Sequence, residues 1–503
     1  MDGVLTTGRQ GAARVLAERG ADLVLGVDVG TSGVGVIAMD RSGAVVARAD
    51  HPVTLLTPRP GWTEQDPGEW AAATRAGLRQ VAAAVGGERV AGIGLSGQMH
   101  GMVPLDKGDK VVRPALLWND QRTGAAVDEI TAAVGRERLI ERTGNPAVTG
   151  FQLPKVVWLR RAEPAAFARL ARVMLPKDYV GLTLTGEAVA EPSDASGTGA
   201  YHLAQRGWDE EVISAVGLEP SLWPRLVASD EVVGSLLASV AGETGLREGT
   251  PVVAGAGDNA AAATGLALGR QHLAVGSVSL GTSGVLFAAL EAPRPDPLGR
   301  VHLFAHADGG FNLLGVTLAA GGSLRWFRDV FAAGSSYDEL LALAAASRPG
   351  AGGVTFKPYL AGERTPHLRP DLRGSFHGLS LATSRADMVR AVLEGVAFSL
   401  REAHDVMAPL ARPSRWLATG GGARSYLWLQ IVADALGAPV GRPADASGHE
   451  VEAGAAEGAA WLAWRGLGHA PQRAPRAARW LEPDPVTADG TAEALARYRV
   501  LGL

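Results

Sequence analysis

The stretch LVLGVDVGTSGVGVIAMD, residues 23–40, places the turn GTSGV between two runs of alternating apolar residues. The same five letters return in VGSVSLGTSGVLFAAL, residues 275–290, again between two such runs. Alternation with a period of two predicts half-buried strands, and the glycines predict tight turns between them. In a chain with 66 glycines, five letters can repeat by chance, so the shared context is more informative than the letters. We interpret the repeat as two related β-hairpins.

The segments that follow each hairpin also resemble one another in order. After the first hairpin, residues 44–53 predict a third antiparallel strand, residues 66–86 a helix with Asp66 as N-cap and Pro67 at its first position, and residues 90–97 a buried strand. After the second hairpin, the pattern predicts strands at 309–318 and 415–421 and helices at 321–333, 385–410 and 425–437. This predicts two structurally related α/β domains that face each other across a cleft.

The expected domain bounds follow from this pattern. We expect an N-terminal domain over residues 23–265 and a C-terminal domain over 266–490, with the change-over near residues 264–273. Residues 1–22 predict a short helix or a disordered extension, and residues 491–503 a C-terminal tail.

Composition disfavours several classes of function. The chain has 503 residues, a formal net charge of −4 and no cysteine. Without a basic excess, nucleic acids and acidic membrane surfaces are disfavoured as partners. The lack of cysteine excludes disulfides, thiolate nucleophiles and cysteine-ligated metals, and it fits a reducing compartment. No apolar stretch reaches the roughly 20 residues of a membrane-spanning helix. We therefore expect a cytoplasmic protein that acts on small molecules, with a homodimer as the candidate assembly.

The two GTSG turns are suited to phosphate. Each turn exposes backbone N–H groups, and the absence of a Cβ at glycine lets phosphate oxygens approach closely. The hydroxyls of Thr31 and Ser32 in the first turn, and of Thr282 and Ser283 beside Gly281 in the second, add donors. Neither turn has the spacing of a P-loop. The alternative is a pair of ordinary tight turns.

Only the first turn has a carboxylate close to it. Asp28 lies two residues before Gly30, whereas Ser279 stands at the matching position before the second turn. Carboxylate oxygens are ligands that Mg²⁺ prefers, usually with waters retained on the ion. Asp28 is therefore the candidate to bind Mg²⁺ through water, with one nucleotide gripped by two unequal turns.

Taken together, these and further motifs resemble the FGGY carbohydrate kinases, in particular the xylulokinase group of that family. The motifs extend over both halves of the chain: DVGTSGV at 28–34, SGQMHG at 96–101, LWNDQR at 117–122, GAGDNAA at 255–261, YLAGERTPH at 359–367 and GGGARS at 420–425. The resemblance implies two ribonuclease H-like domains of the actin-like ATPase type. It also implies ATP and Mg²⁺ as cofactors and phosphoryl transfer to the 5-hydroxyl of D-xylulose.

Candidate site residues follow from these motifs. Asp258 stands where an apolar strand gives way to a helix, and with the family resemblance we interpret it as the general base; without it, an aspartate that caps the helix would be the better interpretation. The predicted sugar-binding residues are Gln98, Met99, His100, Trp118, Asn119, Asp120, Arg122 and Asn259. For LWNDQR, an internal ion pair that shapes a loop is an equally good interpretation. The resemblance assigns Gly420, Gly421, Gly422 and Ser425 to the adenosine and Gly281, Thr282 and Ser283 to its phosphates.

One departure from the family pattern leaves alternatives open. Position 35 is Gly, where the family usually has Lys or Arg, so a cation expected near the transferring phosphoryl group is missing. The alternatives are a kinase for another ketose or polyol, such as ribulose or glycerol, and a weakly active sugar- or nucleotide-binding paralogue on the same fold.

Overall fold

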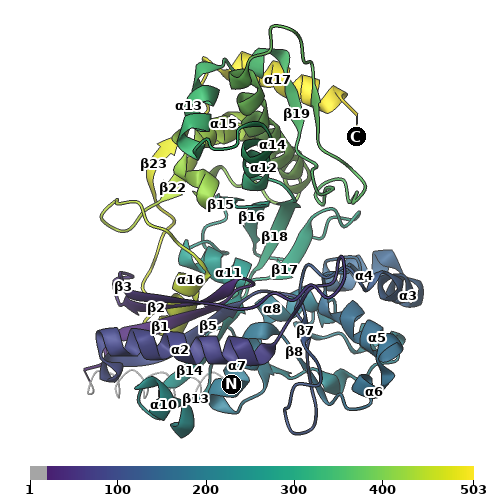
Figure 1. Cartoon of the computed structure of the whole chain (residues 1–503). Coiled ribbons are helices and arrows are strands. Elements are labelled where there is room, and N and C mark those ends of the chain that lie inside the picture. The colour runs from purple at the N-terminus through teal and green to yellow at the C-terminus, as the bar shows by residue number, and fades with distance from the viewer. Residues whose placement is uncertain (1–19, 503) are drawn as a thin grey trace. The chain divides into compact units, whose positions relative to one another are not determined.

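The computed structural model describes residues 20–502, and their contacts divide into two compact units (Figure 1). Unit 1 contains the chain up to Gly269 together with Phe304–Phe311 and Ala453–Arg473. Unit 2 contains Arg270–Leu303, Asn312–Glu452 and Ala474–Leu503. Of the expected extension 1–22, residues 1–19 lie outside the described residues. Asp22, at the end of this segment, forms an ion pair with Arg89 at 2.6 Å.

A six-stranded sheet forms the centre of unit 1, with the strand order β13-β14-β5-β1-β2-β3. In chain order its strands are β1 (Leu23–Val29), β2 (Gly33–Asp40), β3 (Val45–Pro52), β5 (Val90–Gly97), β13 (Val232–Ser235) and β14 (Pro251–Gly257). β1, β2 and β3 form the predicted antiparallel meander, while β5 runs parallel to β1 and β14 runs parallel to β5.

A seven-stranded sheet with the order β17-β18-β16-β15-β21-β22-β23 forms the centre of unit 2. Its strands are β15 (Val275–Leu280), β16 (Gly284–Leu290), β17 (His302–Ala305), β18 (Phe311–Thr317), β21 (Arg415–Thr419), β22 (Val440–Pro443) and β23 (Ala477–Leu481). The cores β3-β2-β1-β5-β14 and β18-β16-β15-β21-β22 share one order: the third, second, first, fourth and fifth strand along the chain. This shared order confirms the predicted α/β fold of two related domains.

Helices cover both faces of the unit 1 sheet. α2 (Pro67–Val85) and α7 (Pro176–Thr185) pack on one face, and α11 (Asp258–Gly265) and α16 (Ala455–Gly466) pack on the other. α2 begins as predicted, because the Asp66 side chain accepts a hydrogen bond from Gly68 N at 2.8 Å. Glu69 does not close a capping box; its carboxylate instead accepts from Thr54 N at 2.7 Å.

α16 belongs by its contacts to unit 1, although it comes late in the chain. It lies within the predicted C-terminal domain, yet in Figure 1 this yellow-green helix lies against the purple β1 of unit 1. The close packing depends on glycine. A Cβ at Gly26 of β1 would lie 2.0 Å from the Ala456 carbonyl oxygen, and a Cβ at Gly94 of β5 would lie 1.9 Å from that of Ala459. The sheet glycines therefore let the α16 backbone approach at a distance that no side chain permits.

A helical region of unit 1 packs beside the sheet around its own cluster of buried apolar residues. Its helices are α3 (Gly124–Val134), α4 (Arg136–Thr143), α5 (Gln152–Ala162), α6 (Pro164–Phe167) and α9 (Glu210–Ala215). Other elements of unit 1 are β4 (Glu64–Gln65), β6 (Val103–Leu105), β7 (Ala115–Leu116), β8 (Arg172–Met174), β9 (Val189–Ala190), α8 (Pro192–Ala195), β10 (Tyr201–His202), β11 (Gly207–Trp208), β12 (Arg225–Leu226) and α10 (Ala238–Thr244).

The helices of unit 2 agree with the predicted segments and add two more. They are α12 (Gly321–Phe331), α13 (Tyr337–Ala346), α14 (Arg385–Met407), α15 (Tyr426–Leu436) and α17 (Ala488–Val500), with the short strands β19 (Thr355–Lys357) and β20 (Ser375–His377). The expected tail 491–503 is therefore helical as far as residue 500, and Tyr498 in it is fully buried. Within residues 20–502, we find no helix with both the length and the apolar character needed to cross a membrane.

Candidate active site

Asp258 is the first residue of α11 and follows directly after the buried strand β14. The N-cap of this helix is Gly257, and the Asp258 side chain caps no later turn. Its Oδ1 accepts instead from the backbone N and the side-chain Nδ2 of the neighbouring Asn259, at 2.7 and 3.0 Å. Burial raises the pKa of Asp258 to about 6, against the effect of these hydrogen bonds. The carboxyl can therefore both hold and release a proton near neutral pH.

Asp28 lies at the end of β1, opposite Gly35 of β2 and Ser96 of β5. Its pKa is raised to about 7, mainly by burial and then by repulsion from Asp258, while the Ser96 hydroxyl lowers it. The predicted pair of acids is thus close enough to interact electrostatically. The buried Oδ1 atom of Asp28 accepts no hydrogen bond. An unsatisfied carboxylate oxygen of this kind fits a water ligand of Mg²⁺.

The described residues 20–502 do not add further side-chain ligands to Asp28 to make a complete metal site. Among residues 20–502, no three His, Asp or Glu side chains are arranged to hold a metal ion. The fit to Mg²⁺ therefore rests on Asp28 alone, with water and phosphate oxygens as the further ligands that this ion usually keeps.

His100 is held by unit 1 on three sides. Its backbone has φ 70°, an uncommon left-handed conformation, and its ring stacks on Phe151 at 4.8 Å and lies 5.7 Å from Phe304. The Nδ1 atom lies 2.6 Å from the Gly197 carbonyl oxygen. Because a carbonyl only accepts, Nδ1 must carry the proton, and the neutral ring then has its lone pair on Nε2. Nε2 is the atom to which a sugar hydroxyl could donate.

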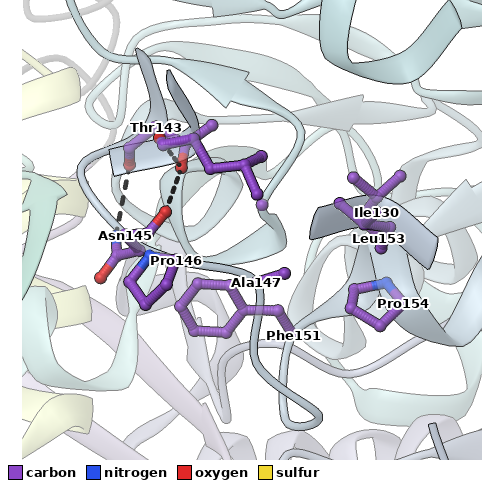
Figure 2. Close-up of a pocket in the computed structure, with 10 residues that line it drawn as sticks. Ile130, Thr143, Asn145, Pro146, Ala147, Phe151, Leu153 and Pro154 are labelled. Atoms are coloured by element: carbon purple, nitrogen blue, oxygen red, sulfur yellow. Dashed lines mark hydrogen bonds between the residues drawn. The ribbon is translucent and has the colours of Figure 1, made fainter. Parts of the chain in front are cut away.

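Phe151, the residue on which the His100 ring stacks, also lines a small pocket (Figure 2). Figure 2 shows Phe151 beside Pro146 and Ala147, with hydrogen bonds between Thr143 and Asn145 closing one end. The volume of this pocket is about 10 Å³, which is roughly the space of one water molecule. It is therefore part of the packing behind Phe151 and too small for a pentose.

Met99 and Asn259 lie beside the base. A Cβ at Gly257 would be 2.8 Å from Met99 Cγ, so the methionine packs on the backbone just before Asp258. Asn259 Nδ2 also lies 3.9 Å from the Met99 sulfur. The strand ends of β5 and β14 thus bring Met99, His100, Asp258 and Asn259 together, as parallel neighbouring strands require.

The LWNDQR motif divides into two parts with different surroundings. Trp118 is 39% exposed, which leaves one face of the indole available, and Asn119 accepts from the Thr63 hydroxyl at 2.7 Å. Asp120 and Arg122 form a buried ion pair, with Nη2 of Arg122 2.8 Å from the Asp120 carboxylate and Nη1 2.6 Å from Glu64. Their side chains are 0% and 1% exposed. These two residues therefore match the alternative prediction of an internal ion pair that shapes the loop.

The first GTSG turn is tied to the same region. Gly30 N donates to Gly33 O at 2.9 Å, which closes the turn. Ser32 is exposed, but the hydroxyl of Thr31 accepts from Trp118 Nε1 at 3.0 Å and lies 3.0 Å from Gln98 Oε1. Gln98 is only 2% exposed. Thr31 and Gln98 thus lie together, but both side chains are already engaged with protein partners.

The predicted nucleotide residues of unit 2 lie around its own GTSG turn. The carbonyls of Gly281 and Thr282 accept from the backbone of residues 320–322 at the start of α12, the shortest bond being 2.7 Å from Gly321 N to Gly281 O. Gly420 has φ 83°, and a Cβ there would lie 2.9 Å from the Leu280 carbonyl carbon. The glycine run after β21 thus lies against the second turn.

Beyond Gly420, the members of the glycine run differ in their surroundings. A Cβ at Gly422 would meet Leu280 at 2.8 Å, whereas one at Gly421 would meet nothing within 4 Å. Ser283 lies in the second turn itself. Ser425 is the N-cap of α15, where its hydroxyl accepts from Trp428 N at 3.2 Å. Gly421 is therefore the position of this run with room beside it.

Sequence reasoning missed several residues around these sites. Nη2 of Arg325, in the second turn of α12, lies 3.4 Å from the Thr282 hydroxyl, so a cation lies beside the second GTSG turn. Lys155 is fully buried and donates to the carbonyls of His100 and Gly150 at 2.8 and 2.5 Å. Burial lowers the pKa of Lys155 to about 7. No spacing rule links Arg325 to Thr282 or Lys155 to His100, because these contacts join residues 43 and 55 positions apart in the chain.

Each half of the chain matches a model of one protein family. Residues 23–265 match the N-terminal domain of the FGGY family of carbohydrate kinases, and residues 276–465 match its C-terminal domain.

Similar proteins include enzymes with a named activity. A xylulose kinase from Lactococcus lactis subsp. lactis is 41% identical to this chain over 416 residues, or 82% of each protein. A xylulose kinase from Bacillus subtilis is 39% identical over 451 residues, or 88% of each. The crystal structure of a xyloylose kinase from Brucella ovis aligns with a TM-score of 0.89 and 39% identity, over 95% of this chain and 98% of that one.

Proposed function

The chain belongs to the FGGY family of carbohydrate kinases, and on that premise we propose that it transfers the γ-phosphoryl group of ATP to the 5-hydroxyl of D-xylulose. The choice of sugar rests on the relatives named xylulose kinase. The observation that carries the chemistry is Asp258, a carboxyl with a pKa raised to about 6 beside Met99 and Asn259.

In this reaction Asp258 is the general base. The 5-hydroxyl oxygen forms a bond to the γ-phosphorus while the bond from that phosphorus to the bridging oxygen of ADP breaks, and the hydroxyl proton passes to the Asp258 carboxylate. A pKa of about 6 suits this role, because the group is mostly ionised at neutral pH yet is a stronger base than an ordinary aspartate.

The sugar would be bound by unit 1. His100 Nε2 accepts a hydrogen bond from a sugar hydroxyl, Met99 and the exposed part of Trp118 supply apolar contact, and the amides of Asn259 and Asn119 bind further oxygens. The loops that carry these groups would be held in place by Gln98, Asp120 and Arg122, which would not contact the sugar themselves.

The nucleotide would be bound by the two GTSG turns and the glycine run. The backbone of Thr31 and Ser32 and the second turn bind phosphate oxygens, the glycine run receives the adenosine, and Arg325 supplies positive charge beside Thr282. Mg²⁺, with Asp28 as its outer ligand through water, would neutralise charge on the phosphates. The proposal also places the enzyme in the cytoplasm, with a homodimer as its candidate assembly.

Gly35 keeps a second candidate function in view, a weakly active paralogue that binds sugar or nucleotide. Position 35 has no side chain to replace the cation usual in this family. The retained Asp28–Asp258 pair and the cation at Arg325 favour catalysis, because a binding protein needs no base with a raised pKa.

The test is ADP release from MgATP over D-xylulose, ribulose and glycerol, with and without Mg²⁺. We expect D-xylulose to give the highest kcat/KM and Asp258→Asn to lower kcat by about 10²- to 10⁴-fold while the sugar still binds. Because the base must be ionised, kcat/KM should fall as the pH drops below about 6. The matched change Asp106→Asn, in a turn between β6 and β7, should leave kcat unchanged.

Two results would contradict the proposal. If D-xylulose releases no more ADP than buffer alone, the substrate is wrong. If no sugar gives turnover but D-xylulose binds in calorimetry, the chain is the binding paralogue.

A further inference from the structure

Gln65 in β4 closes a ring of hydrogen bonds between the first GTSG turn and the sugar-binding loop. Its Nε2 donates to the Thr31 carbonyl at 2.8 Å, and its Oε1 accepts from Gln98 Nε2 at 2.9 Å. Thr31 Oγ1 closes the ring through Gln98 Oε1 at 3.0 Å. The two glutamines are buried, with Gln65 1% and Gln98 2% exposed, while Thr31 is half-buried. A member that lost its partner here would be left unsatisfied away from water.

Two fixed groups set the direction of every bond in this ring. The Thr31 carbonyl can only accept, and the indole Nε1 of Trp70, 3.1 Å from Gln65 Oε1, can only donate. The Gln65 amide therefore has one allowed orientation. Gln98 must then present its Nε2 to Gln65 and its Oε1 to Thr31, so the Thr31 hydroxyl is the donor in that last bond.

This direction extends to Trp118 at the sugar-binding loop. Because the Thr31 proton points to Gln98, the hydroxyl has a lone pair for Trp118 Nε1, which donates to it at 3.0 Å. Reversing the Gln65 amide would place two acceptors, or two donors, face to face at each step. One side chain that touches neither proposed ligand thus fixes the polarity of the turn, of Gln98 and of the indole.

We propose that Gln65 is a positioning residue, which holds the first turn and Trp118 in one register through the direction of its hydrogen bonds. The proposal rests on the proposed function, which gives the turn and Trp118 their ligands. It implies that Thr31 offers a nucleotide phosphate its backbone N–H and not its hydroxyl proton, which is committed to Gln98.

Two substitutions separate hydrogen-bond direction from shape. Gln65→Met keeps the length of the side chain and removes all its polar atoms. Gln65→Glu keeps the shape, but an ionised carboxylate cannot donate to the Thr31 carbonyl, whereas a protonated carboxyl can. The groups that contact the Gln65 amide, Thr31, Trp70 and Gln98, are uncharged. The charged neighbours in the chain are engaged elsewhere, Glu64 with Arg113 and Arg122, and Asp66 at the start of α2.

The experiment measures MgADP affinity by calorimetry and kcat/KM for D-xylulose, each relative to wild type at the same pH, from about pH 5.5 to about pH 8.5. Gln65→Met should weaken both by about tenfold at every pH, the loss expected for about one hydrogen bond. Gln65→Glu should match that loss at high pH and recover towards wild type as the pH falls, because its protonated form restores the donor.

Gln152→Met is the matched control. Gln152 is another buried glutamine of unit 1; it donates to the carbonyls of Gly101 and Met174 and accepts from the Trp223 indole, as Gln65 does from Trp70. The Gln152→Met substitution should lower the thermal midpoint of unfolding, as Gln65→Met does, and should leave MgADP affinity unchanged.

The proposal is overturned if Gln65→Glu shows no pH-dependent recovery, or if Gln152→Met weakens MgADP binding as much as Gln65→Met. Its failure is distinct from that of the proposed function: a wild type that binds MgADP without turning over D-xylulose refutes the reaction, while the MgADP measurements still test Gln65.

Discussion

Gly35 lies between two aspartates on one face of the unit 1 sheet. The register sets Gly35 opposite Asp28 on one side and Asp50 on the other, and directly opposed residues point to the same face. Burial and the nearby Asp258 raise the pKa of Asp28 to about 7, so the folded protein holds this proton more tightly than the unfolded chain. This group therefore costs stability as the pH rises from about 4 to about 7.

Gly35→Lys should relieve that cost. A Cβ at position 35 would lie 3.2 Å from Asp50 Oδ1, a tight contact that a small shift of this flexible side chain relieves, and the lysine would have two acidic neighbours. Its ammonium should lower the pKa of Asp28. Relative to Gly35→Ala, which adds the Cβ alone, we expect Gly35→Lys to be more stable by about 1–2 kcal/mol at pH 8, with the difference vanishing near pH 4. Denaturant unfolding at both pH values measures this, and equal differences would mean that the charge does not reach Asp28.

At this scale the sequence predicts residues whose role is set by their neighbours in the chain. The position of Asp258 is an example, because the end of an apolar strand before a helix already places its carboxyl; its proposed role as a base comes from the family resemblance. Gln65 could not be found in this way, since its three partners are the backbone carbonyl of Thr31, the indole of Trp70 and the amide of Gln98, which lie far from it or on other elements. The two interpretations of Asp120 and Arg122 were equal in sequence because burial, not spacing, separates them.

Among the elements, α16 has a position that depends on a few small residues. Its backbone lies against Gly26 and Gly94 of the sheet, and a Cβ at Gly458 would lie 1.7 Å from the Ala261 carbonyl oxygen of α11. α11 carries Asp258 at its first residue, so this helix pair also positions the proposed base. Residues 455–466 are not among the predicted helices, and their sequence does not tell which sheet the helix covers.

Gly94→Ala should therefore destabilise unit 1. The added methyl would meet the Ala459 carbonyl oxygen at 1.9 Å, and since this is backbone, no change of rotamer can relieve the clash. We expect a loss of about 2–4 kcal/mol in the free energy of unfolding, measured by denaturant titration. Gly242→Ala in α10 is the control, because a Cβ there meets nothing within 4 Å, and it should be neutral or stabilising by up to about 1 kcal/mol. Equal effects of the two changes would show that α16 can move away from the sheet.

On the scale of the whole molecule, the chain returns to unit 1 twice after leaving it. Residues 304–311 bring Phe304 to His100, and residues 453–473 bring α16 to β1 and β5. The repeat of the two hairpins predicts the two related folds, because each hairpin begins one sheet. It cannot predict these returns, which depend on contacts between residues more than 200 positions apart, such as Phe304 with His100 and Arg48 with Glu457 at 2.6 Å.

Because the chain returns to unit 1 twice, a fragment that ends near residue 269 should not fold well on its own. A polypeptide of residues 1–269 keeps all six strands of the unit 1 sheet but lacks α16, which buries Val24, Ile37 and Met39 on one face. Exposing that face should leave the fragment without a cooperative thermal transition and prone to aggregate. Joining residues 453–473 to its end through a flexible Gly/Ser linker should restore the transition, because the helix can then cover the same residues. Circular dichroism on heating distinguishes these cases: a cooperative transition in the fragment without α16, at the midpoint of the joined chain, would mean that the sheet of unit 1 is stable with one face uncovered.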